Sequence, residues 1–220
     1  MTIEQLISPI VPTLLPTDTG NRALYLMEEN NFQQLPLIID ERYKALIQEN
    51  DVLDWEAPGS PLSIAHFLDY KPAVFAHSHP FDAMRIAHAQ NLSVVPVIDN
   101  ENKYLGAITS SELLKYITEN SGLDMPGGII VLEISPRNYT LHEIARICEN
   151  EDVLLTSTQL RTNSHNGMLE VTLKTNRTDI DAVIASLERH NYKVIEAHGE
   201  QAEDEDVQDR FNNLMNFINI

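Results

Sequence analysis

The sequence is poor in the residues that form disulfides, membrane spans and nucleic-acid-binding surfaces. Its single cysteine, Cys148, cannot form an intrachain disulfide. No apolar run approaches the roughly 20 residues that cross a bilayer, and the start of the chain lacks the basic and apolar regions of a signal peptide. Only 15 Lys and Arg stand against 33 Asp and Glu, so a net charge of −18 repels polyanions. We expect a cytoplasmic protein that binds neither membranes nor nucleic acid.

The chain does have enough apolar residues for a packed core. It is 220 residues long and 43% hydrophobic, which favours one or two compact domains. The negative charge is spread unevenly: residues 1–126 carry −10, residues 127–199 carry −3 and residues 200–220 carry −5. The last segment is therefore the most acidic per residue, which is typical of a solvated linker.

An internal repeat of about 60 residues occupies the first half of the chain. Identities and conservative pairs recur when the sequence is displaced by 60 positions, and by 61 after a one-residue insertion. Two copies of one unit are therefore expected, at residues 1–60 and 61–122. The aligned identities are Pro12/Pro72, Ala23/Ala83, Asn31/Asn91, Pro36/Pro96, Ile38/Ile98, Tyr43/Tyr104 and Ile47/Ile108.

Both copies are predicted to fold as β-α-β-β-α, because apolar residues first recur at helical spacing and then form two short β-branched runs around a polar turn. The leading strands are expected near Leu15 and Phe75. The remaining predicted elements are, in copy one, a helix after Thr19, strands at 35–39 and 43–47 and a short helix from Asp51; and, in copy two, a helix at 80–90, strands at 94–99 and 104–109 and a helix at 111–117.

Two tandem copies with the strand opening Val95-Pro96-Val97-Ile98-Asp99 and the strand-to-helix passage Gly106–Glu112 resemble a CBS domain pair, or Bateman module. The resemblance implies a regulatory ligand, such as AMP, another adenine nucleotide or S-adenosylmethionine, in two clefts between the copies. It also implies that a hydroxyl and a carboxylate at T/S-x-x-D hold this ligand. The carboxylate would accept hydrogen bonds from the ribose hydroxyls, and the hydroxyl and nearby helix N-terminus would suit a phosphate.

Neither copy carries the complete hydroxyl and carboxylate pair, and copy one also has Ala45 in place of the glycine. No Lys or Arg occupies the matching positions, so adenosine or AMP-like ligands are favoured over ATP. The alternative is that these side chains simply cap the helices that follow. The predicted site residues are Gln48 and Asp51 in copy one, with Asp51 facing Ser93 and Val94 across the crossed cleft, and Thr109 and Glu112 in copy two, with Glu112 facing Gln33 and Gln34.

Residues 128–199 are predicted to form a third unit with the order β-α-β-β-α-β, the ferredoxin-like split motif. It resembles an ACT domain, which implies amino-acid binding at a dimer interface beside a glycine in the first strand-to-helix loop. Tyr139 stands in that glycine's place and would fill the pocket. The predicted elements are a strand at 129–134, a helix carrying Leu141, Ile144, Ala145 and Cys148, strands at 152–161 and 168–174 around an Asn166-Gly167 turn, a helix starting at Asp179 and Asp181, and a strand at 192–197.

Residues 200–220 are predicted to be an acidic linker followed by an amphipathic helix that mediates dimerisation or bridges the modules. The apolar stripe of this helix consists of Val207, Phe211, Leu214, Met215 and Ile218.

The sequence as a whole predicts an α+β protein: a Bateman module of tandem CBS units, a ferredoxin-like ACT-like domain and a C-terminal helix. This arrangement resembles the acetoin-utilisation accessory proteins of bacilli. We expect a non-enzymatic homodimer with no obligatory cofactor or metal, which senses an adenine nucleotide and acts on a protein target. Two alternatives stay open, a ligand-free assembly module and amino-acid sensing by the ACT-like domain. His77 and His79 are expected to be exposed loop residues, and Cys148 a core thiol.

Overall fold

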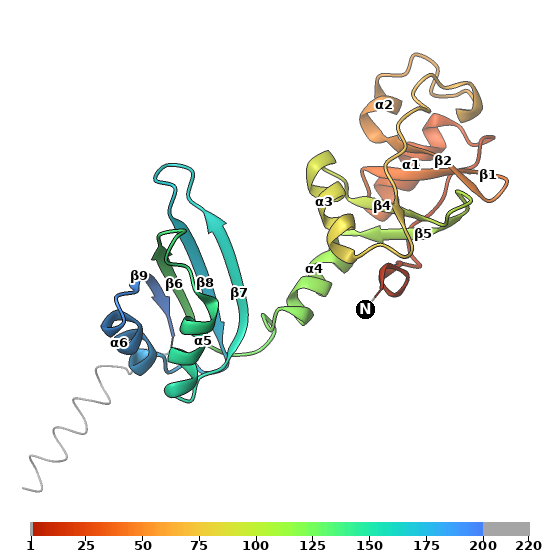
Figure 1. Cartoon of the computed structure of the whole chain (residues 1–220). Coiled ribbons are helices and arrows are strands. Elements are labelled where there is room, and N and C mark those ends of the chain that lie inside the picture. The colour runs from red at the N-terminus through yellow and green to blue at the C-terminus, as the bar shows by residue number, and fades with distance from the viewer. Residues whose placement is uncertain (1, 200–220) are drawn as a thin grey trace, which may run out of the picture. The chain divides into compact units, whose positions relative to one another are not determined.

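The structure is a computed structural model that describes residues 2–199. The chain divides into two compact units that meet between Ile117 and Thr118 (Figure 1). The predicted linker and helix at 200–220 lie outside the described residues. No helix in residues 2–199 is both long and apolar enough to cross a membrane.

The first unit contains the two copies of the repeat, and both have the predicted helix-strand-strand-helix order after the leading segment. Thr19 precedes the first helix and caps it, because its Oγ1 accepts a hydrogen bond from the Arg22 backbone N at 3.2 Å. Proline 80 begins the corresponding helix of copy two, where its missing N–H costs nothing. The elements are η1 (Ile3–Leu6), α1 (Gly20–Asn30), β1 (Gln34–Ile39), β2 (Arg42–Gln48), α2 (Glu49–Leu53), η2 (Leu62–Ile64), β3 (Val74–Phe75), α3 (Pro80–Gln90), β4 (Val94–Ile98), β5 (Tyr104–Thr109) and α4 (Ser110–Asn120), which runs across the unit boundary.

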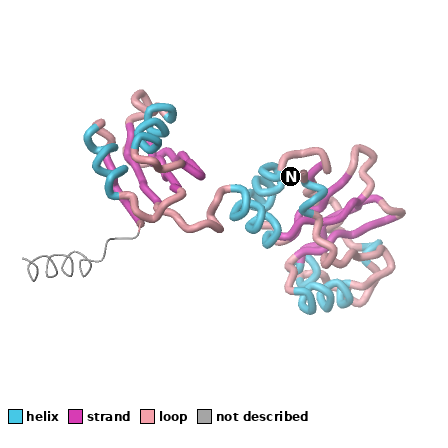
Figure 2. The backbone as a smooth tube through the Cα atoms, turned by 90° about the horizontal axis from the view of Figure 1, so that it is seen from below, coloured by secondary structure: helices cyan, strands magenta, loops and turns pink. Residues whose placement is uncertain are grey.

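The two antiparallel hairpins β1–β2 and β4–β5 share a register irregularity. Pairing shifts between Leu37 and Ile38 in copy one and between Val97 and Ile98 in copy two, which are equivalent positions. The one-residue insertion in the repeat falls in the turn that follows, so it lengthens a turn and leaves the strands intact. The hairpins of the two copies lie beside each other in the unit (Figures 1 and 2).

The leading strands differ between the copies. In copy two, β3 pairs in parallel with β4, as predicted near Phe75. In copy one only a single parallel bridge forms, between Leu14 and Leu37, so the strand expected near Leu15 is wrong. Pro12 and Pro16 flank this bridge, and prolines have no N–H with which to extend the ladder.

Each copy completes its core with the segment that precedes the other copy. Ile3 and Leu6 from the start of the chain are buried in the core that contains the strands of copy two. Leu62 and Ala65, which lead into copy two, are buried in the core of copy one. This exchange means that neither copy has a complete core by itself.

The second unit is a four-stranded antiparallel sheet in the order β7-β8-β6-β9. Helices α5 and α6 cover one face of it (Figures 1 and 2). Alternate residues of β6, namely Ile130, Leu132 and Ile134, point into the core beneath the helices. This order is the ferredoxin-like topology, so the predicted α+β fold class is confirmed. The elements are β6 (Ile129–Ile134), α5 (Leu141–Asn150), β7 (Leu155–Thr162), β8 (Leu169–Thr175), α6 (Asp181–Arg189) and β9 (Lys193–His198).

Candidate functional site

A polar pocket of about 340 Å³ lies between the two copies in the first unit. Copy one contributes the start of β1, the end of β2 and the first turn of α2, and copy two contributes the end of α3. Gln34 and Gln48 come together here because they are partners at the end of the β1–β2 ladder. The lining residues are Gln33, Gln34, Gln48, Glu49, Asn50, Gln90 and Asn91.

Hydrogen bonds join the two copies beside this pocket. The backbone N and Oγ of Ser93 donate to Gln34 Oε1 at 2.9 and 2.7 Å, and the Gln33 backbone N donates to Ser93 Oγ at 3.4 Å. Val94 follows on β4, fully buried and opposite Thr109 in the register. The structure thus brings Gln33, Gln34 and Ser93 together from segments 60 residues apart.

Asp51 lies at the edge of the pocket, close to copy two. Gln48 Nε2 donates to Asp51 Oδ2 at 3.5 Å. The pKa of Tyr70 is raised, chiefly by desolvation and also by the charge of Asp51, and the Tyr70 hydroxyl donates to Gln90 Oε1 at 2.9 Å. Asp51 and Tyr70 therefore border the pocket that Gln48 and Gln90 line.

Tyr70, Gln90 and Asn91 are site residues that the sequence did not reveal. They lie outside the T/S-x-x-D positions and come from the far end of a helix and the loop before β3. Among these three residues, only Asn91 stood out in the sequence, through its identity with Asn31 in the repeat. The structure gives that identity another reason, because both residues end a helix in the left-handed conformation, at φ 57° and 52°.

The two T/S-x-x-D positions are used differently in the two copies. In copy two the Thr109 hydroxyl bonds the Glu112 carboxylate, and Thr109 Oγ1 accepts from the Glu112 backbone N at 3.4 Å. This pair therefore caps α4, as the alternative interpretation held. In copy one, Gln48 makes no side-chain capping bond to α2. The carboxylates of Asp51 and Glu112 are thus engaged differently, and the predicted approach of Glu112 to Gln33 and Gln34 stays a prediction.

The electrostatics of the pocket favour an uncharged hydrogen-bonding ligand. Amide side chains supply most of its lining, and they offer both donors and acceptors. The one charged lining residue is Glu49, and Asp51 adds a second carboxylate at the edge. A phosphate would therefore meet repulsion here, whereas ribose hydroxyls or a nucleobase edge would find partners.

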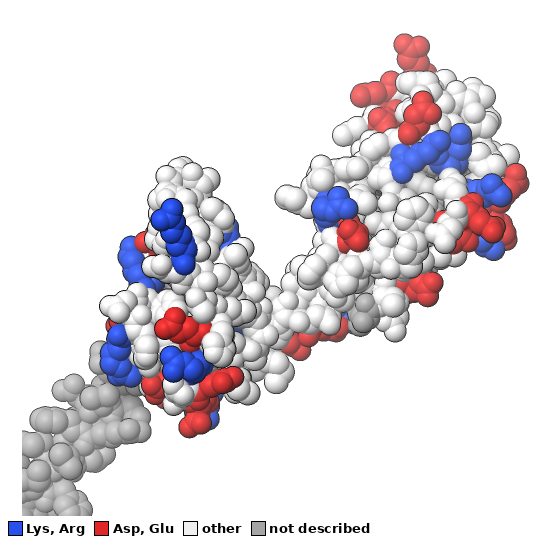
Figure 3. Space-filling view, in the orientation of Figure 1, with Lys and Arg blue, Asp and Glu red and all other residues white. Residues whose placement is uncertain are grey.

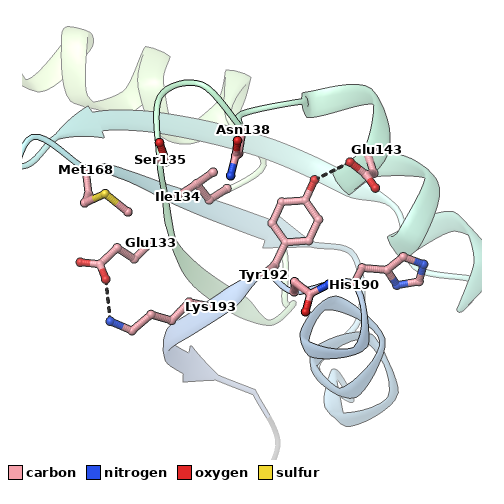
Figure 4. A pocket seen from close by; sticks show the side chains of 10 residues that line it. Glu133, Ile134, Ser135, Asn138, Glu143, Met168, His190, Tyr192 and Lys193 are labelled. Carbon is pink, nitrogen blue, oxygen red and sulfur yellow. Dashed lines mark hydrogen bonds and ion pairs between the residues drawn. The ribbon is translucent and has the colours of Figure 1, made fainter.

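The second unit carries a pocket of about 350 Å³ where β6, α5, β8 and β9 meet (Figure 4). Lys193 Nζ donates to Glu133 Oε1 at 2.6 Å, and this hydrogen bond lowers the pKa of Glu133. The Tyr192 hydroxyl donates to Glu143 Oε2 at 3.0 Å. Ser135, Asn138, Met168 and His190 complete the surface together with Ile134 and Asn191.

Tyr139, which was expected to fill the pocket of an ACT domain, packs against the core of the second unit. It is not among the residues that line the pocket in Figure 4. A cavity therefore persists beside the loop between β6 and α5 despite the bulky residue.

Comparisons with known proteins give this geometry a family. The CBS domain family matches residues 68–119. These residues form a CBS domain. Copy one repeats its helix-strand-strand-helix order and its register irregularity. The match covers most of copy two, which contributes Gln90 and Asn91 to the pocket.

Solved structures include several similar CBS-pair proteins. A CBS domain pair/ACT domain protein from Thermotoga maritima is 17% identical, with a TM-score of 0.47 over 54% of this chain and 98% of that one. A putative acetoin utilization protein (AcuB) from Vibrio cholerae is 20% identical, with a TM-score of 0.47 over 56% of this chain and 95% of that one. CBSX2, known from Arabidopsis thaliana, is 19% identical in its complex with AMP, with a TM-score of 0.46 over 54% of this chain and 96% of that one. The family match at residues 68–119 confirms the predicted resemblance to a CBS domain.

Two other candidates for chemistry, outside the pocket between the copies, have structural roles. His79 Nδ1 accepts from the Phe81 backbone N at 3.2 Å and so caps α3. Cys148 is completely buried in the core of the second unit, and desolvation raises its pKa to about 11. Within residues 2–199 no group of three His, Cys, Asp or Glu side chains could hold a metal ion.

Proposed function

We propose that this protein is a non-enzymatic regulator whose CBS pair binds an adenine nucleoside or AMP-like nucleotide, S-adenosylmethionine included, in the pocket between the copies. The observation that carries the proposal is the different use of the two carboxylates. Glu112 is engaged with Thr109 at the start of α4, whereas Asp51 lies beside an amide-lined pocket and caps nothing.

The pocket offers partners for each uncharged part of such a ligand. Asp51 is placed to accept hydrogen bonds from two ribose hydroxyls, and bonds to a charged acceptor are stronger than neutral ones. Amides from both copies offer donors and acceptors to a base edge. A volume of about 340 Å³ is small for a ligand site, so a nucleoside suits it better than a triphosphate.

Regulation would follow from the ligand's contact with both copies. A ligand held by copy one at Asp51 and by copy two at Gln90 favours whichever arrangement of the two copies brings those groups together. Only such a difference in affinity between arrangements can shift their populations. The sequence suggests a homodimer and a protein target, and these would respond to the shift between arrangements. Both stay predictions.

Calorimetric titration and thermal unfolding with adenosine, AMP, S-adenosylmethionine and ATP test the proposal. A ligand at about 100 times its Kd adds about 2.7 kcal/mol of stability, so the melting temperature of the first unit should rise by on the order of 10 °C. Adenosine and AMP should bind more tightly than ATP, and Asp51→Asn should weaken binding by roughly 10-fold or more, about 1.4 kcal/mol.

The matched control is Glu112→Gln, which changes the equivalent carboxylate of copy two. It should lower the stability of α4 slightly and leave the affinity for adenosine unchanged. No heat of binding and no rise in melting temperature with any of the four compounds at millimolar concentration would favour a ligand-free assembly module. Equal loss of binding in both variants would contradict the placement of the site in copy one.

A second candidate function is amino-acid binding by the second unit, which we propose to be ACT-like. The pocket of Figure 4 places carboxylates and an ammonium group together, in Glu133, Glu143 and Lys193, and these could hold the α-ammonium and α-carboxylate of an amino acid. A melting-temperature screen with the standard amino acids tests it. A hit that Glu143→Gln removes and Asp51→Asn retains would support this site, and no hit would leave the unit with a structural role.

A further inference from the structure

The pocket of the second unit contains two carboxylates that are engaged differently. Both oxygens of Glu133 are occupied, because Oε1 accepts from Lys193 Nζ at 2.6 Å and Oε2 accepts from Asn166 Nδ2 at 3.2 Å. Glu143 accepts one hydrogen bond, from the Tyr192 hydroxyl at 3.0 Å, and forms no ion pair with any residue in the range 2–199. Glu143 is therefore the carboxylate of this pocket that has no cation beside it.

The two carboxylates come from different elements and lie on different sides of the pocket (Figure 4). Glu133 and its partner Lys193 are neighbours across the β6–β9 ladder, whereas Glu143 belongs to the first turn of α5. The half-buried Met168 and the Tyr192 ring add apolar surface to the same pocket. A ligand that reaches both carboxylates therefore needs polar groups at two separated points, joined by an apolar part.

The charges that line the pocket do not balance. Glu133 and Glu143 face a single ammonium, that of Lys193, which leaves a net charge of −1. His190 also lines the pocket, and its Nδ1 is bonded to the Ser186 carbonyl at 2.8 Å. On the visible face of the second unit, by contrast, Lys and Arg are mixed with Asp and Glu (Figure 3). The pocket thus has room for one more positive charge.

We infer that this pocket selects an amino acid with a positively charged side chain, of the lysine or ornithine type, and that Glu143 determines this preference. The inference rests on the amino-acid site proposed above for the second unit. The Glu133–Lys193 pair offers a carboxylate to the ligand's α-ammonium and an ammonium to its α-carboxylate. The methylene chain of the ligand lies along Met168 and the Tyr192 ring, and its side-chain ammonium pairs with Glu143.

The surroundings of Glu143 hold it in place for this contact. Tyr192 is almost completely buried, and its hydroxyl fixes the carboxylate through Oε2. A carboxylate has about four acceptor positions, so it can receive a ligand ammonium as well. The first turn of α5 also favours a negative charge through the helix dipole. The dipole explains an acid in this turn, but it does not explain why that acid lines a pocket and is bonded to Tyr192.

Other classes of amino acid suit the pocket less well. An acidic side chain would place a second carboxylate against Glu143, and like charges repel. An apolar side chain would cover the Glu143 carboxylate without giving it a partner, and burying an unpaired charge is unfavourable. A basic side chain removes both problems.

Calorimetric titration of the full-length protein compares lysine with norleucine, which has the same carbon skeleton without the side-chain ammonium. Lysine should bind roughly 10-fold more tightly, as expected for a hydrogen bond to a charged group. Ornithine should also bind more tightly than norleucine, and glutamate should not bind. Added salt should reduce the preference for lysine, because it screens the ion pair.

Glu143→Gln tests the assigned role, since it keeps the shape of the side chain and removes its charge. The variant should bind lysine about as weakly as norleucine, and its affinity for norleucine should match that of the parent. The matched control is Glu149→Gln, the same change at an exposed position of α5 outside the pocket, which should keep the preference for lysine. Circular dichroism checks that both variants are folded.

Failure of the inference and failure of the amino-acid site give different results. Equal affinity for lysine and norleucine, or a lysine preference that a folded Glu143→Gln variant retains, would overturn the role of Glu143 and leave an amino-acid site. Binding of 1,5-diaminopentane as tight as that of lysine would overturn recognition of the α-carboxylate by Lys193. No heat of binding with any of these compounds at millimolar concentration would overturn both the site and its preference.

Discussion

At the scale of single residues, burial decides which polar groups are available for chemistry. Thr109 is buried and bonded to Glu112, and Cys148 is buried among apolar side chains, whereas Asp51 is half-buried beside a polar pocket. By residue type alone, all of these side chains were candidates for ligand binding or catalysis. Their surroundings leave Asp51 as the side chain suited to hold a ligand.

The thiol of Cys148 should be inert in the native protein. Its pKa of about 11 keeps it protonated at neutral pH, and it is completely buried. Ellman's reagent should therefore react with it only after unfolding. Cys148→Ser should destabilise the second unit by about 1–3 kcal/mol, because a hydroxyl in this apolar core lacks the hydrogen-bond partners that water gave it. Rapid reaction in native buffer would contradict this assignment.

Tyr192 should make the stability of the second unit depend on alkaline pH. Desolvation, followed by its hydrogen bond to Glu143, raises the pKa of Tyr192 from 10.0 to about 12. Because the folded-state pKa is the higher one, this stabilisation is complete below pH 10 and is lost as the pH rises through 12. Tyr192→Phe should flatten that decline.

Urea unfolding at pH 8 and pH 11, followed by NMR signals of the second unit, measures this effect. At pH 8 the variant should lose about 1–2 kcal/mol, the net value of a hydrogen bond to a charged group. Tyr139→Phe serves as the control because Tyr139 also packs against the core of the second unit, whereas the bond to Glu143 comes from Tyr192. An unchanged pH dependence in Tyr192→Phe would contradict the role of this bond.

At the scale of elements, the crossed packing of the leading segments explains a glycine that only copy two requires. Gly106 on β5 has φ +146°, and a Cβ built there would clash with Ile7 Cγ2. The adjacent Ser8 backbone N donates to the Ala107 carbonyl at 2.8 Å, which holds the N-terminal segment against β5. The equivalent residue in copy one, Ala45, is accommodated in a regular strand.

Gly106→Ala should therefore destabilise the first unit by about 2 kcal/mol or more, through both backbone strain and the clash with Ile7. The double variant with Ile7→Ala should recover part of this loss, since it removes the clash but leaves the strain. Ala45→Gly in copy one should cost only about 1 kcal/mol, the typical price of glycine in a strand. Urea unfolding gives all the values, and full additivity of Gly106→Ala and Ile7→Ala would contradict the contact.

At the scale of the whole molecule, the described chain has separate cores in its two units, so we expect separate unfolding transitions. Trp55 is the only tryptophan, and it lies in the core of copy one with its ring edge against Phe67. Its fluorescence therefore reports the first unit alone, whereas far-ultraviolet circular dichroism reports both.

The Cys148→Ser variant should accordingly shift the circular dichroism transition and leave the Trp55 fluorescence transition in place. An adenine nucleoside should do the reverse, moving the fluorescence transition to higher urea. If both probes shift together in both experiments, the two units unfold as one, and the division of the chain between Ile117 and Thr118 would not be a boundary of stability.

The sequence by itself determined the repeat and, except for the leading strand of copy one, the order of the elements, because hydrophobic periodicity and turn residues are local signals and recur in both copies. Some predicted element boundaries were wrong next to the end of a helix. β7 begins at Leu155 rather than Asp152, because Asp152, at φ 56°, still belongs to the turn that ends α5. Helix α6 likewise begins at Asp181, two residues after the predicted start at Asp179.

Only the tertiary structure decided which of the two carboxylates bonds a hydroxyl at the start of its helix and what surrounds each of them. The pocket that Gln90 and Asn91 share with copy one, and the exchange of leading segments, both join residues that are distant in the chain. Such contacts depend on how the two copies pack against each other, and no periodicity within one copy encodes that packing.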